Sequence, residues 1–255
     1  MDVHPSAAQG FDRAADAYER GRPGYPEPAV AWLVEALGIG PGRAVVDLAA
    51  GTGKLTRQLL PSGAGLVAIE PVAGMRARLA GSLPGVRVEA GTAEAMPLPD
   101  GAADVVVVGQ AFHWFDGTRA LAEIHRVLRP GGGLGLVWNV RDESVPWVAQ
   151  LTRIIEPHRG DAPSYQSRRW REAFAATSLF EPLREHGFSH AQRGDRDMVR
   201  DRMGSVSFVA SLDPAVRAEV LAEVDEQLDH HPALRGRPTV TIPYRTDVFW
   251  TFRRP

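Results

Sequence analysis

Short apolar runs alternate with segments of helical periodicity along the first 140 residues, and this alternation restricts the fold more than any other feature. Runs of this kind occupy residues 44–48, 66–70, 86–89, 103–109 and 134–138. Their continuous apolar character is typical of strands that are buried on both faces of a parallel sheet. Because right-handed crossovers connect such strands, the pattern predicts a doubly wound α/β fold.

The rhythm changes after Val140. Residues 145–158, 164–178 and 197–230 favour helix, whereas Gly187–Arg193 and Thr239–Phe252 have the composition of two further strands. The prediction is therefore an α/β fold with a Rossmann-like, doubly wound, mostly parallel seven-stranded sheet and a helical cap insertion.

This pattern divides the chain into three parts. Residues 1–145 are expected to form the cofactor-binding core with an N-terminal lid. Residues 146–235 are expected to form a mainly helical substrate cap, and residues 236–255 a final strand that returns to the core sheet.

Composition excludes several classes of protein. The 255 residues are 44% apolar and 24% charged, with a net charge of -2, so no electrostatic feature favours nucleic acid or an anionic membrane as a partner. No cysteine is present, which excludes disulfides, thiolate metal sites and a cysteine nucleophile. The adjacent His230 and His231 point in different directions on a helix end, and no metal site is predicted. We expect a cytoplasmic protein of undetermined oligomeric state.

A glycine-rich turn follows the first apolar run, and three types of site have such a turn. A phosphate-binding P-loop requires a glycine where Leu48 stands and Ser or Thr where Leu55 stands. The dinucleotide fingerprint fits Gly51 and Gly53 but requires a third glycine in place of Thr56. The third type of site has an acidic residue at the end of the strand that precedes the turn, and Asp47 occupies that position.

The segment from Asp47 to Gly53 resembles motif I of the class I S-adenosylmethionine-dependent methyltransferases, with alanine at position 49 where the family usually has glycine. Glu70 ends the second strand, where an acidic side chain can accept hydrogen bonds from both ribose hydroxyls. The resemblance implies that Pro71 and Met75 line the adenine. It also implies that the segment after Gly91 contacts the adenine edge, although Thr92 replaces a frequent aspartate there.

The fourth strand is followed by Gln110-Ala111-Phe112-His113-Trp114-Phe115-Asp116, a run similar to the type 11 and trans-aconitate methyltransferase-like small-molecule group. Residues 11–26 resemble the cofactor lid of that group, as do residues 243–246. Taken together, the resemblance implies S-adenosyl-L-methionine as cofactor. Its expected binding residues are Tyr18, Arg22, Asp47, Ala49, Gly51, Thr52, Gly53, Glu70, Pro71, Met75, Thr92, Ala93, Glu94, Gln110, Ala111, Phe112 and Trp114.

The implied function is methyl transfer by in-line displacement to a small-molecule acceptor with an O-, N- or C-nucleophile, a carboxylate among the candidates. Tyr18 and Trp114 are candidates for facing the sulfonium. His113 is the candidate general base for a hydroxyl or amine acceptor, with a packed structural histidine as the alternative. An NAD(P)-dependent oxidoreductase and a non-catalytic cofactor-binding protein are the alternative functions.

Arginine and aromatic residues in or near the cap suit an aromatic or acidic acceptor, but an arginine-rich helix is more often a solvated face. These residues are Arg141, Arg168, Arg169, Trp170, Arg171 and Phe174.

Overall fold

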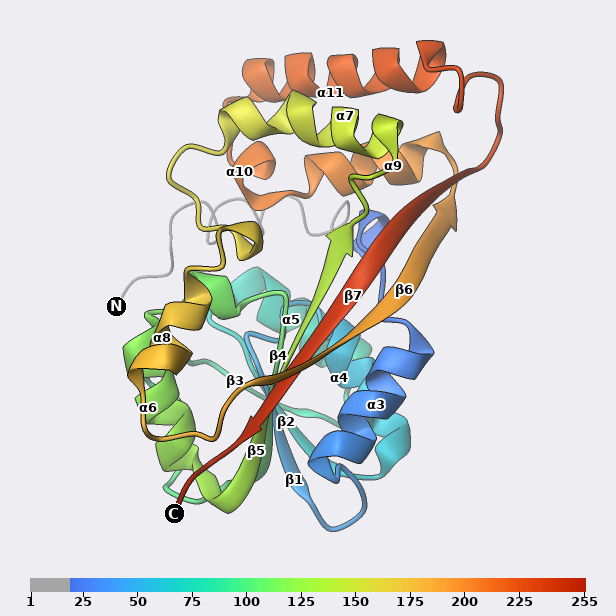
Figure 1. Cartoon of the computed structure of the whole chain (residues 1–255). Coiled ribbons are helices and arrows are strands. Elements are labelled where there is room, and N and C mark those ends of the chain that lie inside the picture. Colours follow the sequence, from blue (N-terminus) through green and yellow to red (C-terminus); the bar gives the residue numbers. More distant parts are fainter. Residues whose placement is uncertain (1–18) are drawn as a thin grey trace.

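A computed structural model describes residues 19–255, in which a single seven-stranded sheet forms the centre (Figure 1). The strand order is β3-β2-β1-β4-β5-β7-β6. The first five strands are parallel, and β7 runs antiparallel between β5 and β6. The predicted Rossmann-like, mostly parallel sheet is confirmed. The strands are β1 (Ala44–Leu48), β2 (Gly65–Ile69), β3 (Arg87–Glu89), β4 (Ala103–Gly109), β5 (Leu128–Arg141), β6 (Arg184–Gly194) and β7 (Val240–Phe252).

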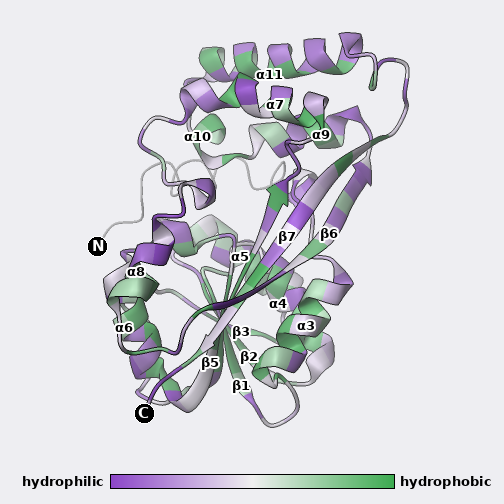
Figure 2. Ribbon diagram, in the orientation of Figure 1, coloured by the Kyte–Doolittle hydropathy of each residue, from purple (hydrophilic) through white to green (hydrophobic). Residues whose placement is uncertain are grey.

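Helices cover both faces of the sheet. On one face, α3, α4 and α5 enclose one apolar core, and on the other face α6 and α8 enclose a second. Figure 2 shows hydrophobic residues concentrated along the central strands and the helix sides that face them. The bounds are α3 (Glu27–Leu37), α4 (Lys54–Leu59), α5 (Ala73–Ser82), α6 (Gly117–Val127) and α8 (Trp170–Ala176).

Four successive valines allow strand β4 to contribute side chains to both cores. In β4, Val106 and Val108 face the core beneath α6, whereas Val105 and Val107 face the core beneath α3. All four are fully buried. Successive side chains of a strand point to opposite faces, so a continuous apolar run is required where both faces are covered.

The fifth strand begins earlier than the sequence predicts. The apolar run predicts a strand over residues 134–138, but α6 ends at Val127 and the Pro130-Gly131-Gly132-Gly133 run already belongs to β5. The pairing of β4 with β5 shifts register between Ala103 and Val105. A Cβ at Gly132 would lie 2.9 Å from the carbonyl oxygens of Arg129 and Asp104. Glycine therefore marks a close backbone approach inside a strand here.

A third core lies above the carboxyl ends of the parallel strands (Figure 1). Trp147, Met203, Val209 and Val224 contribute to it, and so does Tyr244 of β7. Strands β5 and β7 are long enough to pair within the main sheet and to continue into this upper layer. The helices of the layer are α7 (Pro146–Ile155), α9 (Arg196–Gly204), α10 (Ser207–Ala210) and α11 (Pro214–His230). The predicted cap segment also contains β6, which pairs with β7 from Val240 to Trp250.

Membrane-spanning helices are not found in residues 19–255, where no helix combines the necessary length and apolar character.

Substitution of Gly132 by alanine tests the placement of the glycine run in β5. The added Cβ has to displace two backbone carbonyls, and we expect the free energy of unfolding to fall by about 1–3 kcal/mol in urea denaturation. Gly40→Ala is the matched control because no atom lies within 4 Å of its Cβ position. Equal stability of the two variants would contradict the close approach at Gly132.

Candidate active site

A cavity of about 300 Å³ lies between the carboxyl ends of β1, β2, β4 and β5 and the upper helical layer. Ligands of open parallel sheets bind at this edge. The cavity wall contains His113 and many of the residues expected to bind a cofactor. These are Arg22, Ala49, Gly51, Glu70, Pro71, Met75, Thr92, Ala93, Glu94, Gln110, Ala111 and Trp114. Tyr18 lies outside the described residues.

The turn after β1 uses left-handed backbone conformations to bring main chain to the cavity. Ala49 has φ 56° and Gly51 has φ 59°. An alanine in this region costs about 1 kcal/mol that a glycine avoids, and the turn keeps its shape despite the substitution. Gly53, with φ 84°, does not line the cavity. A Cβ there would lie 2.9 Å from Leu79 Cγ, so this glycine allows α4 to pack on α5.

Glu70 connects this turn to the end of β2. Its side chain is 3% exposed: Oε2 accepts a hydrogen bond from the Gly51 N–H and Oε1 accepts one from the Val72 N–H, both at 2.8 Å. Burial raises the pKa of the Glu70 carboxyl, while the two backbone N–H groups and Arg76 act in the opposite direction. The carboxylate therefore points at the glycine turn and borders the cavity.

Asp47 lies behind the turn, beside a smaller cavity of about 40 Å³ that Thr52 also lines. Thr56 Oγ1 donates a 2.5 Å hydrogen bond to Oδ2 of Asp47, and Oδ1 is buried without a partner among the described residues. Burial raises the pKa of Asp47 to about 7, and the charge of Glu70 adds to the rise. Asp47 and Thr52 thus face the smaller cavity and not the larger one.

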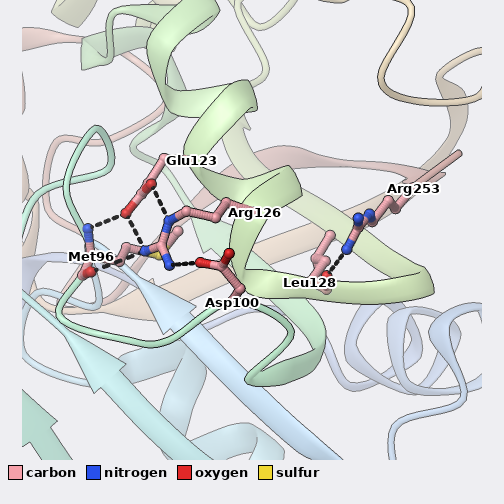
Figure 3. A network of polar contacts seen from close by, with 6 residues as sticks. All are labelled: Met96, Asp100, Glu123, Arg126, Leu128 and Arg253. Atoms are coloured by element: carbon pink, nitrogen blue, oxygen red, sulfur yellow. Dashed lines mark hydrogen bonds and ion pairs between the residues drawn. The ribbon is translucent and has the colours of Figure 1, made fainter. Parts of the chain in front are cut away.

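An ion-pair network fixes the segment that carries Thr92, Ala93 and Glu94 (Figure 3). Arg126 of α6 binds Glu123 at 2.7 Å and Asp100 at 2.6 Å. Glu123 in turn accepts a 2.8 Å hydrogen bond from the Met96 N–H. The loop is therefore attached to α6 at two points, Met96 and Asp100. At the other end of the view, Arg253 donates to the Leu128 carbonyl.

His113 sits in the loop after β4 as a neutral imidazole. Trp138 Nε1 donates to His113 Nδ1 at 3.3 Å, which leaves the ring proton on Nε2. Burial, together with the positive charges of Arg22 and Arg159, lowers the pKa of His113 to about 3.

Phe112 was expected to contact the cofactor, and the structure places it elsewhere. Its side chain is 1% exposed and packs against Phe115, Trp170 and Phe174 in the core beneath α6. The 3-10 turn Phe112–Trp114 directs His113 and Trp114 toward the cavity and turns Phe112 inward.

The upper wall of the cavity comes from residues that the sequence analysis did not assign to the site. They include Trp138, Glu143, Thr152, Ile155, Arg159, Tyr165, Arg202 and Phe208. Of the arginine and aromatic residues considered for the acceptor, Arg141 alone borders this cavity. Arg168 and Arg169 are exposed, Arg171 pairs with Glu185, and Trp170 is in the core. Arg168 and Arg169 thus lie in solvent just before α8, and Arg171 of α8 lies over the rings of Trp170 and Phe249.

Arg22, in the last part of the expected lid, borders both cavities and donates a 2.9 Å hydrogen bond to the Ser205 carbonyl.

No cluster of three or more potential metal ligands occurs among residues 19–255. His230 instead contacts the Glu226 carbonyl through Nδ1.

Comparisons with known proteins agree with this geometry. Residues 46–136 match a family described as a methyltransferase domain. The chain is 40% identical over 236 residues to an uncharacterized methyltransferase of Mycobacterium tuberculosis, covering 92% of each chain.

Solved structures of methyltransferases have a similar fold. A putative type II methyltransferase from Anaeromyxobacter dehalogenans superposes with a TM-score of 0.65 at 25% identity, over 91% of this chain and 97% of that one. A phosphoethanolamine N-methyltransferase of Haemonchus contortus, in complex with phosphomonomethylethanolamine and S-adenosylhomocysteine, has a TM-score of 0.60 at 13% identity. That match covers 100% of this chain and 61% of the Haemonchus chain.

Arg126→Met tests whether the network in Figure 3 orders the loop that borders the cavity. Loss of the guanidinium frees Asp100 and Glu123, and we expect amide hydrogen exchange in residues 91–100 to accelerate by about tenfold. Arg200→Met is the matched control because Arg200 of α9 forms an exposed ion pair with Asp225 of α11, outside the loop. Unchanged exchange in Arg126→Met would show that the loop is ordered by other contacts.

Proposed function

The chain belongs to the class I S-adenosylmethionine-dependent methyltransferases, and on that premise we propose that it methylates a small-molecule acceptor by in-line displacement. The observation that carries the proposal is the Glu70 carboxylate, which lies at the cavity and holds the Gly51 N–H. This hydrogen bond joins the glycine-rich turn to Glu70, the acid that we propose binds the ribose, at one edge of the sheet.

The residues around the cavity fit the cofactor. Each Glu70 oxygen accepts one backbone hydrogen bond and retains a lone pair for a ribose hydroxyl. We assign the adenine to the part of the cavity between Met75 and Ala93. The buried, unpartnered Oδ1 of Asp47 faces the amino-acid end, where a ligand ammonium would supply its missing partner and lower its pKa.

When bound, S-adenosylmethionine supplies a methyl group on a sulfonium, which an acceptor nucleophile takes in one displacement that leaves S-adenosylhomocysteine. The protein's part is to align the acceptor and to exclude water, and alignment of this kind is worth up to ~7–11 kcal/mol. The upper helical layer covers the strand ends and excludes water. Trp114 borders the cavity and remains our candidate for facing the sulfonium charge, at about 0.5–2 kcal/mol.

We infer a different role for His113 from the one expected. A general base at neutral pH needs a pKa near the working pH and an accessible lone pair. His113 has a pKa of about 3, and its Nδ1 lone pair accepts the Trp138 N–H. The Nε2–H is therefore a hydrogen-bond donor, and His113 positions the acceptor without removing a proton.

Two measurements test the proposed function. Isothermal titration is expected to show binding of S-adenosylhomocysteine but not of NAD, and methyl-labelled S-adenosylmethionine is expected to label a member of a small-molecule acceptor library. Binding of NAD in place of S-adenosylhomocysteine would support the oxidoreductase alternative. Binding of S-adenosylhomocysteine without labelling of any acceptor would support the non-catalytic alternative.

His113→Gln tests the role of the histidine. Glutamine keeps an N–H donor but cannot serve as a base, so we expect kcat within about threefold of wild type and no change in the pH dependence of kcat between pH 6 and pH 9. His113→Ala is expected to raise KM for the acceptor more than it lowers kcat. A loss of kcat of a thousandfold or more in His113→Gln would restore the base role.

A further inference from the structure

Strand β6 forms one edge of the sheet, and within residues 19–255 its outer side has no pairing strand. It stands last in the strand order and pairs with β7 alone (Figure 1). The backbone hydrogen bonds that connect loops, turns and other elements of the described chain do not involve residues 184–194. Because alternate residues of an edge strand direct their N–H and C=O groups away from the sheet, β6 presents a row of unused donors and acceptors.

The sequence of β6 does not protect this edge. The strand has 11 residues and no proline, and its pairing with β7 continues from end to end without a bulge. Charged side chains occur only toward its ends, at Arg184, Glu185 and Arg193, and the central segment Gly187–Ala191 has no acidic residue, lysine or arginine. Short length, proline, bulges and charges along the strand are the features that keep an edge from pairing, so β6 is suited to pair with another strand.

The charges near the two ends of β6 are complementary to each other. Ser189 is the midpoint of the strand, and a two-fold axis through it pairs β6 over its full length with an antiparallel second copy. In this register Glu185 lies opposite the partner's Arg193, and symmetry repeats the pair at the other end. A two-fold interface requires self-complementarity of this kind, and opposite charges on facing residues stabilise strand pairing.

Neighbouring registers lose the match. An axis through His190 places Glu185 opposite the partner's Asp195, which brings two negative charges together. An axis through Phe188 places Glu185 opposite the partner's Ala191 and forms no ion pair with it. The register centred on Ser189 therefore combines full-length pairing with opposite charges at both ends.

One face of β6 leaves room for these ion pairs. Glu185 and Arg193 project from the same face because they are separated by an even number of residues. The three residues between them on that face are small and exposed, namely Gly187, Ser189 and Ala191. Arg193 is exposed and forms no ion pair within residues 19–255, so its guanidinium is available to a carboxylate of a second copy.

The other face of β6 carries aromatic rings that a second copy would cover. His186 stacks on Trp32 of α3 with 4.5 Å between ring centroids, and it meets the ring of Phe188 at 4.7 Å. His186 is exposed, and Trp32 and Phe188 are half-buried. In the register centred on Ser189, Phe188 lies opposite the partner's His190. Cross-strand pairs of rings add to the stability of an antiparallel pair.

We propose that the chain forms a homodimer in which two copies of β6 pair antiparallel about an axis at Ser189 and join the two sheets into one. The ion pairs between Glu185 and the partner's Arg193 set the register, and they favour a second copy of this chain over an unrelated strand. No residue of β6 lines the large cavity, so the dimer does not depend on the proposed methyl transfer.

Sedimentation of charge variants between about 1 and 100 μM protein tests the interface. Wild type is expected to dimerise, and Glu185→Arg and Arg193→Glu are each expected to raise the dimer dissociation constant at least tenfold because like charges then meet at both ends. An equimolar mixture of the two variants restores opposite charges at both ends and is expected to dimerise within about threefold of wild type. Arg153→Glu, on the exposed side of α7, is the matched control and is expected to dimerise as wild type does.

Disulfide cross-linking tests the register. The chain has no cysteine, so Ser189→Cys and Ala191→Cys each introduce a single thiol on the same exposed face of β6. Facing residues of an antiparallel pair have Cα atoms about 4.5–5.5 Å apart, within the range of about 4.4–6.8 Å that a disulfide spans. Two copies of residue 189 face each other at the axis, whereas residue 191 lies about 13 Å along the strand from its own copy. We expect Ser189→Cys to form a covalent dimer at least tenfold faster than Ala191→Cys under mild oxidation.

Three results would overturn the proposal. The first is a wild-type protein that stays monomeric up to 100 μM. The second is a dimer that Glu185→Arg and Arg193→Glu weaken no more than Arg153→Glu does, or that their mixture fails to restore. The third is cross-linking of Ser189→Cys no faster than that of Ala191→Cys. Ser189 is exposed, so Ser189→Cys is expected to keep the Tm of the wild-type protein under reducing conditions, and this test does not depend on the stability of the charge variants.

Discussion

The hydrogen bond from the Gly51 N–H to the Glu70 carboxylate is the contact on which the site depends. It ties the turn after β1 to the residue that ends β2, so two neighbouring parallel strands deliver their functional groups to one place. The same carboxylate caps the Val72 N–H at the start of α5. Because the group is buried, these two donors fix its position at the border of the cavity.

The upper helical layer covers the cavity at the ends of the strands. Strands β5 and β7 pass from the main sheet into the upper layer, where Arg141 of β5 borders the cavity and Tyr244 of β7 accepts a hydrogen bond from Arg202. The cavity is thus lined by the Glu70 carboxylate at the strand ends and by arginines that are far apart in sequence, among them Arg141 and Arg202.

Local sequence patterns predicted the part of the cavity formed by the strand ends, but they could not predict the part formed by the upper helical layer. The strands near the turn, the left-handed turn itself and Glu70 follow from short-range signals: apolar runs, glycine spacing and an acid at a strand end. No sequence motif marks Arg202 of α9, and only the tertiary fold brings it to the cavity and to Tyr244. Phe112 was misassigned because sequence adjacency to His113 does not reveal which way a 3-10 turn directs each side chain.

The most direct test of the account compares the affinity of wild type for S-adenosylhomocysteine and for its 2′,3′-dideoxy analogue, and repeats the comparison with Glu70→Ala. If Glu70 binds the ribose hydroxyls, the analogue binds wild type at least tenfold more weakly, about 1.4 kcal/mol, and Glu70→Ala binds the two compounds with similar affinity. Equal binding of both compounds by wild type would contradict the account, because the carboxylate at the glycine turn would then hold no sugar.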